Sequence, residues 1–315
     1  MCSTTPRIVA IVNPAAGVGR TRRRLREELR LLSADVPGVT VLETHSASEG
    51  RAAAREAAEG GAKVVIAAGG DGTIQTVTAG LLDVGSCADD RPSLAIAPIG
   101  RGNDLASALG FTGRPGELRD GLSGSETRPL DVGRGDVDGR SLLFTNALGI
   151  GFDAAVARRA RAWALPGAGA YVVGILGTLI AGDGPWRLRG RLDREPFDLA
   201  VTLLTVGNGP TTGGGFRLTP RADPSDARWD VCWAEAMGRL GALRLLGRLV
   251  RGRHEEDPRV QSRRCERLEM EIVPPAPIHA DGELVAEAAT RIKLELDGGA
   301  IHVLRPVPFR RVKPP

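Results

Sequence analysis

Three short segments of this sequence combine glycines with polar side chains, a combination suited to binding phosphate. They read Asn13-Pro14-Ala15-Ala16-Gly17, Gly69-Gly70-Asp71-Gly72-Thr73 and Gly100-Arg101-Gly102-Asn103-Asp104. Glycine has no Cβ, so backbone N–H groups can approach phosphate oxygens closely, and a following helix N-terminus adds positive partial charge. Asp71 would repel phosphate directly but could reach it through Mg²⁺, whereas capping of the next helix is the structural alternative. The three segments together favour a phosphate-binding function.

Each segment follows a short apolar run that predicts a buried strand, and helical patterns separate the runs. This alternation predicts an open α/β domain with a parallel sheet, in which ligands bind outside the carboxyl ends of the strands. The three segments would then share one edge of the sheet. The strands are expected at Ile8–Val12, Val39–Thr44, Lys63–Ala68 and Leu94–Ala97, and the helices from Thr21, at Ser48–Glu59, at Thr73–Leu82 and near Asn103.

From about Leu130 the pattern changes to short β-type runs separated by turn residues, which predicts a second, mostly antiparallel domain. With 315 residues and about 150 per domain, two domains fit the length. We expect boundaries at 1–129 and 130–303, with 304–315 returning to the first domain and a cleft between the two. The expected elements are strands Leu199–Val206, Trp229–Trp233, Leu268–Val273 and Arg291–Leu296, hairpin turns Val137–Arg140 and Asp297–Gly299, and helices Tyr171–Ala181 and Leu240–Val250, the last with Leu243, Leu246 and Val250 on one stripe.

The composition excludes several functional classes. Only three of the 42 basic residues are lysines, and none follows a glycine, so the lysine-containing phosphate loop is absent. No histidine precedes an arginine, which excludes the protein-kinase catalytic loop, and no complete GxGxxG occurs. Aromatic residues make up only 3% of the chain, too few for base stacking, so we expect no nucleic-acid partner. With no apolar run of membrane-spanning length and no secretion signal, a cytoplasmic protein is expected.

The motifs, in their order and spacing, resemble the diacylglycerol kinase-like family of lipid kinases, which includes sphingosine and ceramide kinases and bacterial relatives. The resemblance covers nearly the whole chain; GGDGT alone is shared with NAD kinases. It implies a Rossmann-like, NAD kinase-like nucleotide-binding domain, a mainly antiparallel β-sandwich domain and an active site in the interdomain cleft. The matching segments are NPAAG, GGDGT, PIGRGND, LDVG at Leu130–Gly133, FTNALGIGFDA at Phe144–Ala154, GNGPTTGGGFRLTPRADPSDARWD at Gly207–Asp230 and HADGE at His279–Glu283.

The resemblance implies transfer of the γ-phosphoryl group of ATP to a lipid hydroxyl with Mg²⁺, diacylglycerol giving phosphatidic acid being the first expectation. It makes Glu283 the general base, and Asp71, Asp104 and Asp131 a carboxylate network around Mg²⁺. A second metal site would use the Asp226 carboxylate with the backbone carbonyls of Asp223 and Arg228. The implied nucleotide contacts are Asn13, Pro14, Ala15, Ala16, Gly17, Thr44, Gly69, Gly70, Asp71, Gly72, Thr73, Ile74, Gln75, Thr76, Gly100, Arg101 and Asn103.

Structural alternatives and departures accompany these assignments. Asp281-Gly282 would make an ordinary turn with Glu283 as an exposed strand residue. Asp131 and Asp153 could each be a helix cap or a turn residue, and of the two only Asp131 is kept in the site. A plain turn is the alternative for Asp226. The family usually has threonine where this chain has Arg101, whose guanidinium could bind phosphate instead. The metal loop normally reads Asn-Asp-Gly, whereas here it reads Ser225-Asp226-Ala227, and alanine disfavours positive φ.

The expected partners are a lipid alcohol and the inner membrane surface, and a homodimer is left open. Gly167–Gly182 is apolar but too short to span a bilayer, so it either borders the lipid site or packs as a buried helix. Two rival functions remain at this point, a soluble NAD kinase-like nucleotide kinase and a non-catalytic nucleotide-binding regulator. Arginines that could attract anionic headgroups, or simply be solvated, are Arg244, Arg248, Arg251, Arg253, Arg263, Arg264 and Arg267.

Overall fold

The structure, a computed structural model, describes residues 7–17, 19–85, 87–100, 102–124, 126–162, 174–175, 177–178, 181–182 and 184–306. The chain divides into two compact units, one made of Met1–Pro129 with Ile301–Pro315 and the other of Leu130–Ala300. Two strands, β5 (Thr127–Val137) and β13 (Glu283–Leu304), contain the points at which the chain passes between units. The return to the first unit therefore begins inside β13, three residues before position 304.

The first unit contains the parallel sheet that the sequence predicts. β1 (Ile8–Val12) pairs in parallel with β2 (Val39–Glu43) and β3 (Val64–Gly69), and β3 pairs with β4 (Ser93–Pro98). The end of β13 adds to β4, where Val303 lies opposite Leu94. Because β1, β3 and β4 run in the same direction, the segments that follow them leave the sheet at one edge.

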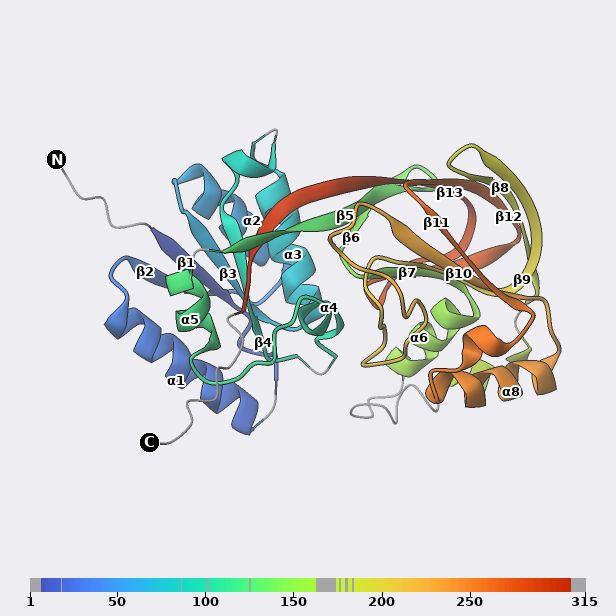
Figure 1. Ribbon diagram of the computed structural model, residues 1–315, viewed down its shortest axis with the longest axis horizontal. Coiled ribbons are helices and arrows are strands. Elements are labelled where there is room, and N and C mark those ends of the chain that lie inside the picture. The colour runs from blue at the N-terminus through green and yellow to red at the C-terminus, as the bar shows by residue number, and fades with distance from the viewer. Residues whose placement is uncertain are drawn as a thin grey trace. The chain divides into compact units, whose positions relative to one another are not determined.

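Helices cover both faces of this sheet (Figure 1). Leu25, Leu29 and Leu32 of α1 (Arg20–Asp35) pack on one face together with Leu118 of α5 (Glu117–Gly124). On the other face lie α2 (Ala47–Glu59) and α3 (Asp71–Leu82). Ser46 caps α2 by accepting from Glu49 N at 3.2 Å, the pattern that begins a helix. The remaining elements are the short helices η1 (Ala88–Asp90) and α4 (Asp104–Ala108).

The second unit is mainly antiparallel, as expected. Its two longest internal strands, β9 (Glu195–Gly207) and β12 (Arg267–Ala280), each pair with β8 (Trp186–Leu192) along one half and with β7 (Ala147–Gly151) along the other. The core includes Phe144 stacked on Trp229, with ring centroids 5.5 Å apart. The further strands are β6 (Arg140–Phe144), β10 (Trp229–Glu235) and β11 (Val260–Cys265).

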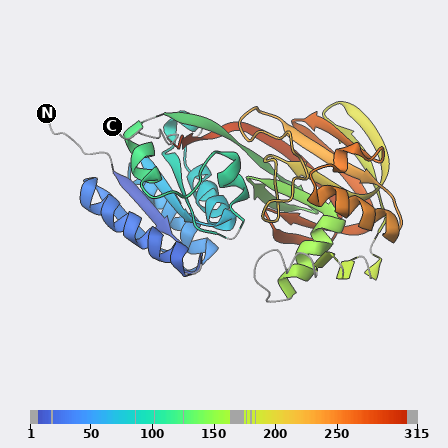
Figure 2. The ribbon, with the colours of Figure 1, turned by 60° about the horizontal axis from the view of Figure 1, so that its bottom comes forward.

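Two helices, α6 (Phe152–Ala162) and α8 (Arg239–Val250), lie on the same side of these strands (Figures 1 and 2). The predicted stripe on α8 is wrong in one respect, because Leu243 is exposed and the inward face contains Ala242, Leu245 and Leu249. The predicted helix Tyr171–Ala181 lies largely outside the described residues, although positions 174, 175, 177, 178 and 181 are helical. The described helices include none long and apolar enough to cross a bilayer.

One predicted hairpin is confirmed and one is wrong. Asp138 and Gly139, with φ of 49° and 83°, form the two-residue turn between β5 and β6. Asp297–Gly299, in contrast, lies within β13, which continues through these residues to Leu304. The glycines serve a close contact there instead, because Gly299 N donates to a carboxylate oxygen of Asp131 at 2.7 Å.

A buried ion pair beside α8 gives a pH-dependent prediction. Asp257 is almost fully buried and accepts from Arg259 at 2.9 Å through both carboxylate oxygens, while Arg248 of α8 lies 3.2 Å away. The hydrogen bonds from Arg259 lower the pKa of Asp257 to about 2, against the opposing effect of burial. A depressed carboxylate pKa stabilises the fold above the unfolded value near 3.8, and this contribution disappears as the pH falls through 2.

We therefore expect Asp257→Asn to reduce the free energy of unfolding at neutral pH by about 2 kcal/mol. The difference between the two proteins should shrink between pH 5 and pH 2, as urea unfolding at a series of pH values would measure. Asp198→Asn is the control, because Asp198 pairs with Arg187 and Arg189 on the exposed surface and should change stability far less. A difference between wild type and Asp257→Asn that stays constant with pH would contradict the interpretation.

Candidate active site

The three glycine-rich segments of the first unit pack backbone against backbone. Ile99 N donates to Gly69 O at 2.9 Å, which joins the segments after β4 and β3. A Cβ on Gly100 would collide with the Cα of Gly70, and one on Gly17 would lie 2.7 Å from Ile99 O. Side chains at these positions would force the segments apart, so glycine is required for the contact. The result is one continuous surface of backbone at the carboxyl edge of the sheet.

The first segment, residues 13–17, is held by side-chain hydrogen bonds. Asn13 accepts from Ala15 N at 2.9 Å and donates to Thr73 Oγ1 at 3.4 Å, which links this segment to the second. The Arg22 guanidinium donates to the carbonyls of Ala15, Ala16 and Gly17 at 3.2, 3.4 and 3.0 Å. Sequence reasoning missed Arg22, because nothing in an arginine-rich helix distinguishes this arginine from its neighbours. Thr44 lies nearby at the end of β2, its hydroxyl 3.5 Å from Val12 O.

The second segment leads directly into α3, which begins at Asp71, two residues before the predicted start. The Asp71 carboxylate accepts from Leu105 N at 3.3 Å, at the start of α4, and α3 has no side-chain cap at its N-cap residue Gly70. Asp71 therefore reaches towards the third segment, so simple capping of α3 does not describe its position. Ile74 is a correction to the predicted nucleotide contacts, since its side chain is fully buried and its N–H bonds to Gly70 O at 3.1 Å.

The third segment places the amide of Asn103 and the carboxyl group of Asp104 beside Asp71. Asn103 has a φ of 55° and donates to Gly100 O at 3.1 Å, while its own Oδ1 is buried and has no hydrogen-bond partner among the described residues. Asp104 begins α4 and is 6% exposed. These hard oxygen groups fit a magnesium ion that accompanies a nucleotide. No cluster of three or more His, Cys, Asp or Glu suited to a metal occurs within the described ranges, and Arg101 lies outside them.

Asp131 occupies a different place from the one predicted. It belongs to the second unit, is 1% exposed, and its two carboxylate oxygens accept from Ala227 N and Gly299 N, both at 2.7 Å. Burial raises the pKa of Asp131, and these two N–H bonds oppose that effect. With both oxygens used by backbone donors, Asp131 joins loop 223–228 to β13. We therefore withdraw it from the predicted magnesium network.

The predicted second metal site in loop 223–228 does not fit a metal ion. Asp226 forms an ion pair with Arg264 and accepts from Arg228 N at 3.1 Å. Asp223 accepts from Ser225 N, also at 3.1 Å. The Arg264 guanidinium already supplies the positive charge that a cation would bring. Ala227, at the position expected to be glycine, has a φ of 56°, so the loop keeps its turn with a less suitable residue.

The HADGE segment of the second unit forms a rigid turn between β12 and β13. Asp281 and Gly282 have φ values of 48° and 82°, and Ala280 pairs with Glu283 across the turn. Burial raises the pKa of Asp281, but its carboxylate is stabilised by the N–H groups of residues 145–147 at 2.7, 2.8 and 2.9 Å. Glu283 follows as the first residue of β13, and it is exposed. The turn therefore fixes the backbone from which the exposed Glu283 side chain extends.

A buried histidine supports the same turn from the other side. His279 Nε2 lies 2.6 Å from an Asp153 carboxylate oxygen, and Gly282 N donates to His279 Nδ1 at 3.3 Å. Burial lowers the pKa of His279, but the charge and hydrogen bond of Asp153 outweigh it, so the pKa is raised overall. Setting Asp153 aside as a cap was wrong. A useful signal in the sequence was His279 itself, a polar residue between Ile278 and Ala280, beyond the end of the predicted strand Leu268–Val273.

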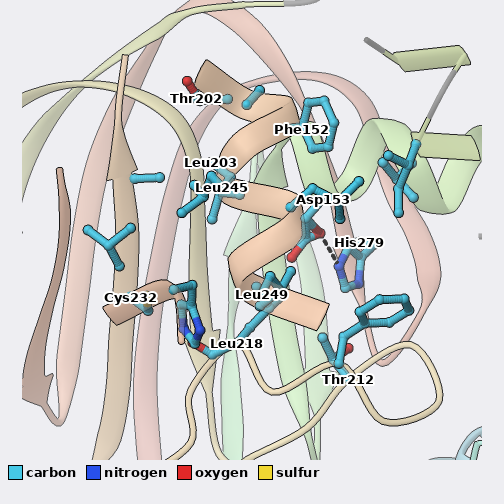
Figure 3. Close-up of a pocket in the computed structure, with 18 residues that line it drawn as sticks. Phe152, Asp153, Thr202, Leu203, Thr212, Leu218, Cys232, Leu245, Leu249 and His279 are labelled. Carbon is cyan, nitrogen blue, oxygen red and sulfur yellow. Dashed lines mark hydrogen bonds and ion pairs between the residues drawn. The ribbon is translucent and has the colours of Figure 1, made fainter. Parts of the chain in front are cut away.

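Asp153 and His279 also line an apolar pocket in the second unit (Figure 3). The walls come from α6, α8, β9, β10 and the loop Thr212–Phe216, whose glycines Gly213, Gly214 and Gly215 all have positive φ. Such a pocket suits an apolar ligand whose one polar group meets a small polar site. The lining residues are Phe152, Asp153, Val156, Ile175, Thr202, Leu203, Thr212, Phe216, Leu218, Cys232, Ala234, Ala242, Leu245, Leu246, Leu249, His254, Val260 and His279.

Comparison with known proteins matches both units to lipid-kinase families. A family model of the diacylglycerol kinase catalytic domain matches residues 7–135, and one of the YegS C-terminal NAD kinase beta sandwich-like domain matches residues 146–305. A protein of Chromohalobacter salexigens named "Probable lipid kinase YegS-like" is 32% identical over 76% of each chain. A diacylglycerol kinase of Mycobacterium tuberculosis is 29% identical over 95% of each chain.

Solved structures show the same fold. A crystal structure of a diacylglycerol kinase from Bacillus anthracis superposes with a TM-score of 0.74 and 24% identity, covering 96% of this chain and 98% of that one. Yeast NADH kinase superposes with a TM-score of 0.54 and 12% identity over 99% of this chain and 91% of that one. At such identities the likeness concerns the fold alone.

Proposed function

The chain belongs to the diacylglycerol kinase-like family of lipid kinases, and from that premise we propose that it phosphorylates the free hydroxyl of diacylglycerol, which gives phosphatidic acid. Membership of a kinase family implies ATP as the phosphoryl donor. The observation that carries the choice of acceptor is the pocket of the second unit, whose walls are apolar apart from a few polar groups such as the Asp153–His279 pair.

The hydrogen bonds that Asp153 already makes favour an uncharged lipid alcohol over a lipid amine as the acceptor. One of its carboxylate oxygens is bonded to His279, and the other accepts from Thr205 Oγ1 at 2.9 Å. A cationic amine entering the pocket would need a carboxylate without such partners. A neutral hydroxyl needs only a hydrogen-bonding group, so diacylglycerol fits the pocket chemistry better than a sphingoid base does.

We assign ATP to the backbone surface of the first unit. The N–H groups of Gly70 to Gly72, at the start of α3, supply donors and a positive helix terminus for phosphate oxygens. Arg22 holds the carbonyls of residues 15–17. Ala15 N and Ala16 N already donate to Asn13, so from this segment we assign the N–H of Gly17 to the nucleotide. Asp71, Asp104 and Asn103 Oδ1 would hold Mg²⁺, which neutralises charge on the triphosphate when bound.

Glu283 is the proposed general base. The acceptor hydroxyl gives its proton to the Glu283 carboxylate as its oxygen attacks the γ-phosphorus, the bond to the bridging oxygen breaks, and ADP leaves. Asp281 and His279 fix the turn that carries Glu283 and act as positioning residues. The donor is thus assigned to residues of the first unit and the acceptor to residues of the second.

A kinase assay with a panel of acceptors tests the proposed function. The purified chain with Mg-ATP should convert diacylglycerol to phosphatidic acid, as measured by mass spectrometry of the lipid product. The panel includes sphingosine, ceramide and NAD. Transfer to NAD alone would establish the soluble nucleotide kinase, and nucleotide binding with no transfer to any acceptor would establish the non-catalytic regulator.

His279→Phe should lower kcat about tenfold, because the change leaves Gly282 N–H without its acceptor and loosens the turn carrying Glu283. The KM for ATP should stay unchanged, since the nucleotide segments belong to the other unit. Steady-state kinetics with both substrates varied measures this separation. His279→Gln, which can keep one of the bonds, should recover part of the rate. A positioning role would be contradicted if His279→Phe and His279→Gln lowered kcat by the same factor and both changed the KM for ATP.

A further inference from the structure

Helix α8 has two apolar faces, and only one of them is buried. Leu245 and Leu249 face the pocket (Figure 3), and Leu245 packs further against Cys232 and Val260. On the opposite side, Leu240 and Leu243 are 61% and 49% exposed. The helix therefore forms a wall with the apolar pocket on one side and exposed leucines on the other.

The surroundings of these leucines are basic. Residues 236–254 contain no aspartate or glutamate but include five arginines, Arg239, Arg244, Arg248, Arg251 and Arg253. Arg248 pairs with Asp257 and Arg253 with Glu256. Arg239 and Arg244 form no ion pair with any residue in the part of the chain that the structure describes. Within the described ranges, two guanidinium groups without an ion-pair partner therefore flank the exposed leucines.

We propose that this surface of α8, formed by Arg239, Leu240, Leu243 and Arg244, docks on an anionic lipid bilayer. Leucines enter the headgroup boundary while arginines contact anionic headgroups, the arrangement of an interfacial amphipathic helix. A second copy of the chain is a poorer occupant, because a twofold contact would bring the same arginines against each other. The docking itself does not depend on the proposed function. Its purpose does, because docking would bring the wall of the pocket to the membrane that contains the lipid acceptor.

Vesicle sedimentation of the full chain tests the docking. The protein should bind vesicles of phosphatidylcholine with phosphatidylglycerol, bind vesicles of phosphatidylcholine alone more weakly, and lose affinity as salt screens the arginines. Arg244→Gln should weaken binding about fivefold, and Leu240→Ser with Leu243→Ser should weaken it about tenfold or more. Leu31→Ser is the matched control, because Leu31 is 45% exposed on α1 outside the proposed surface.

Kinase activity measured on two forms of diacylglycerol separates docking from catalysis. The leucine variants should lose activity on diacylglycerol in anionic vesicles and keep it on a short-chain diacylglycerol dispersed in detergent. Unchanged vesicle binding by both variants would overturn the docking, as would a wild-type dimer that dissociates to monomers on Leu243→Ser in sedimentation velocity. Vesicle binding that follows these expectations, with no kinase activity in either form, would overturn the proposed function alone.

Discussion

Replacing Glu283 with glutamine is expected to reduce phosphoryl transfer at least about a hundredfold, because the amide cannot accept the proton of the acceptor hydroxyl. The substitution keeps the size of the side chain and leaves the turn intact, since the turn is fixed by Asp281 and His279. ATP affinity, measured by equilibrium binding, should therefore stay the same. The expected signature is loss of kcat with retained nucleotide binding.

Glu287→Gln provides the control for this experiment. Glu287 lies on the same strand, β13, and is also exposed, so its substitution makes the same chemical change outside the HADGE turn. It should leave kcat and both KM values unchanged. A fully active Glu283→Gln enzyme would remove this residue from the mechanism and leave the geometry of the turn without a catalytic purpose.

The elements that carry the nucleotide segments could be predicted from the sequence, because their patterns are local. β1 spans the same five residues that its apolar run indicates, and α2 begins and ends within one residue of its predicted bounds. Periodicity and capping act within a few residues, so one sequence contains the signal. The same reasoning places three glycine-rich segments at one sheet edge, where the structure brings them into contact.

The errors share a different cause, which is contact between residues distant in sequence. Asp297–Gly299 has the composition of a turn, yet Gly299 N bonds to Asp131, 168 positions earlier, and the strand continues. Asp153 has the position of a cap, yet it bonds to His279, 126 positions later. Leu243 fits a helical stripe, yet the pocket selects the neighbouring face of α8. Local patterns do not say which distant segment a side chain meets.

Asp131 and Asp226 show why residue roles are harder to transfer than folds. Both occur in segments that match the family, but their carboxylates are used here by backbone N–H groups and by Arg264. A carboxylate whose oxygens already accept hydrogen bonds from groups inside the protein has little capacity left to bind a metal ion. Asp71 differs from them. It belongs to the second glycine-rich segment, and the pairing of β3 with β4 brings that segment beside the third, where Asp71 accepts from Leu105 N.

Asp71→Asn is therefore expected to cause a loss comparable to that of Glu283→Gln, about a hundredfold or more in kcat, through removal of a charge near the triphosphate. Asparagine can still accept from Leu105 N, so the contact with α4 and the fold should persist. If Asp71 helps to hold Mg²⁺, the variant needs more of the ion for half-maximal activity, whereas ATP binding without metal stays close to wild type. A magnesium titration of the rate, together with nucleotide binding in chelator, measures both quantities.

The control for Asp71 lies at the other end of the same helix. Asp83 follows the C-terminal end of α3, whereas Asp71 begins the helix, and it pairs with Arg51 at 2.7 Å. Asp83→Asn should change neither kcat nor the magnesium dependence, although it removes the same charge from the same unit. An Asp71→Asn enzyme with more than about a tenth of wild-type activity and an unchanged magnesium requirement would show that Asp71 only fastens α3 to α4, because asparagine keeps that contact and only the charge is lost.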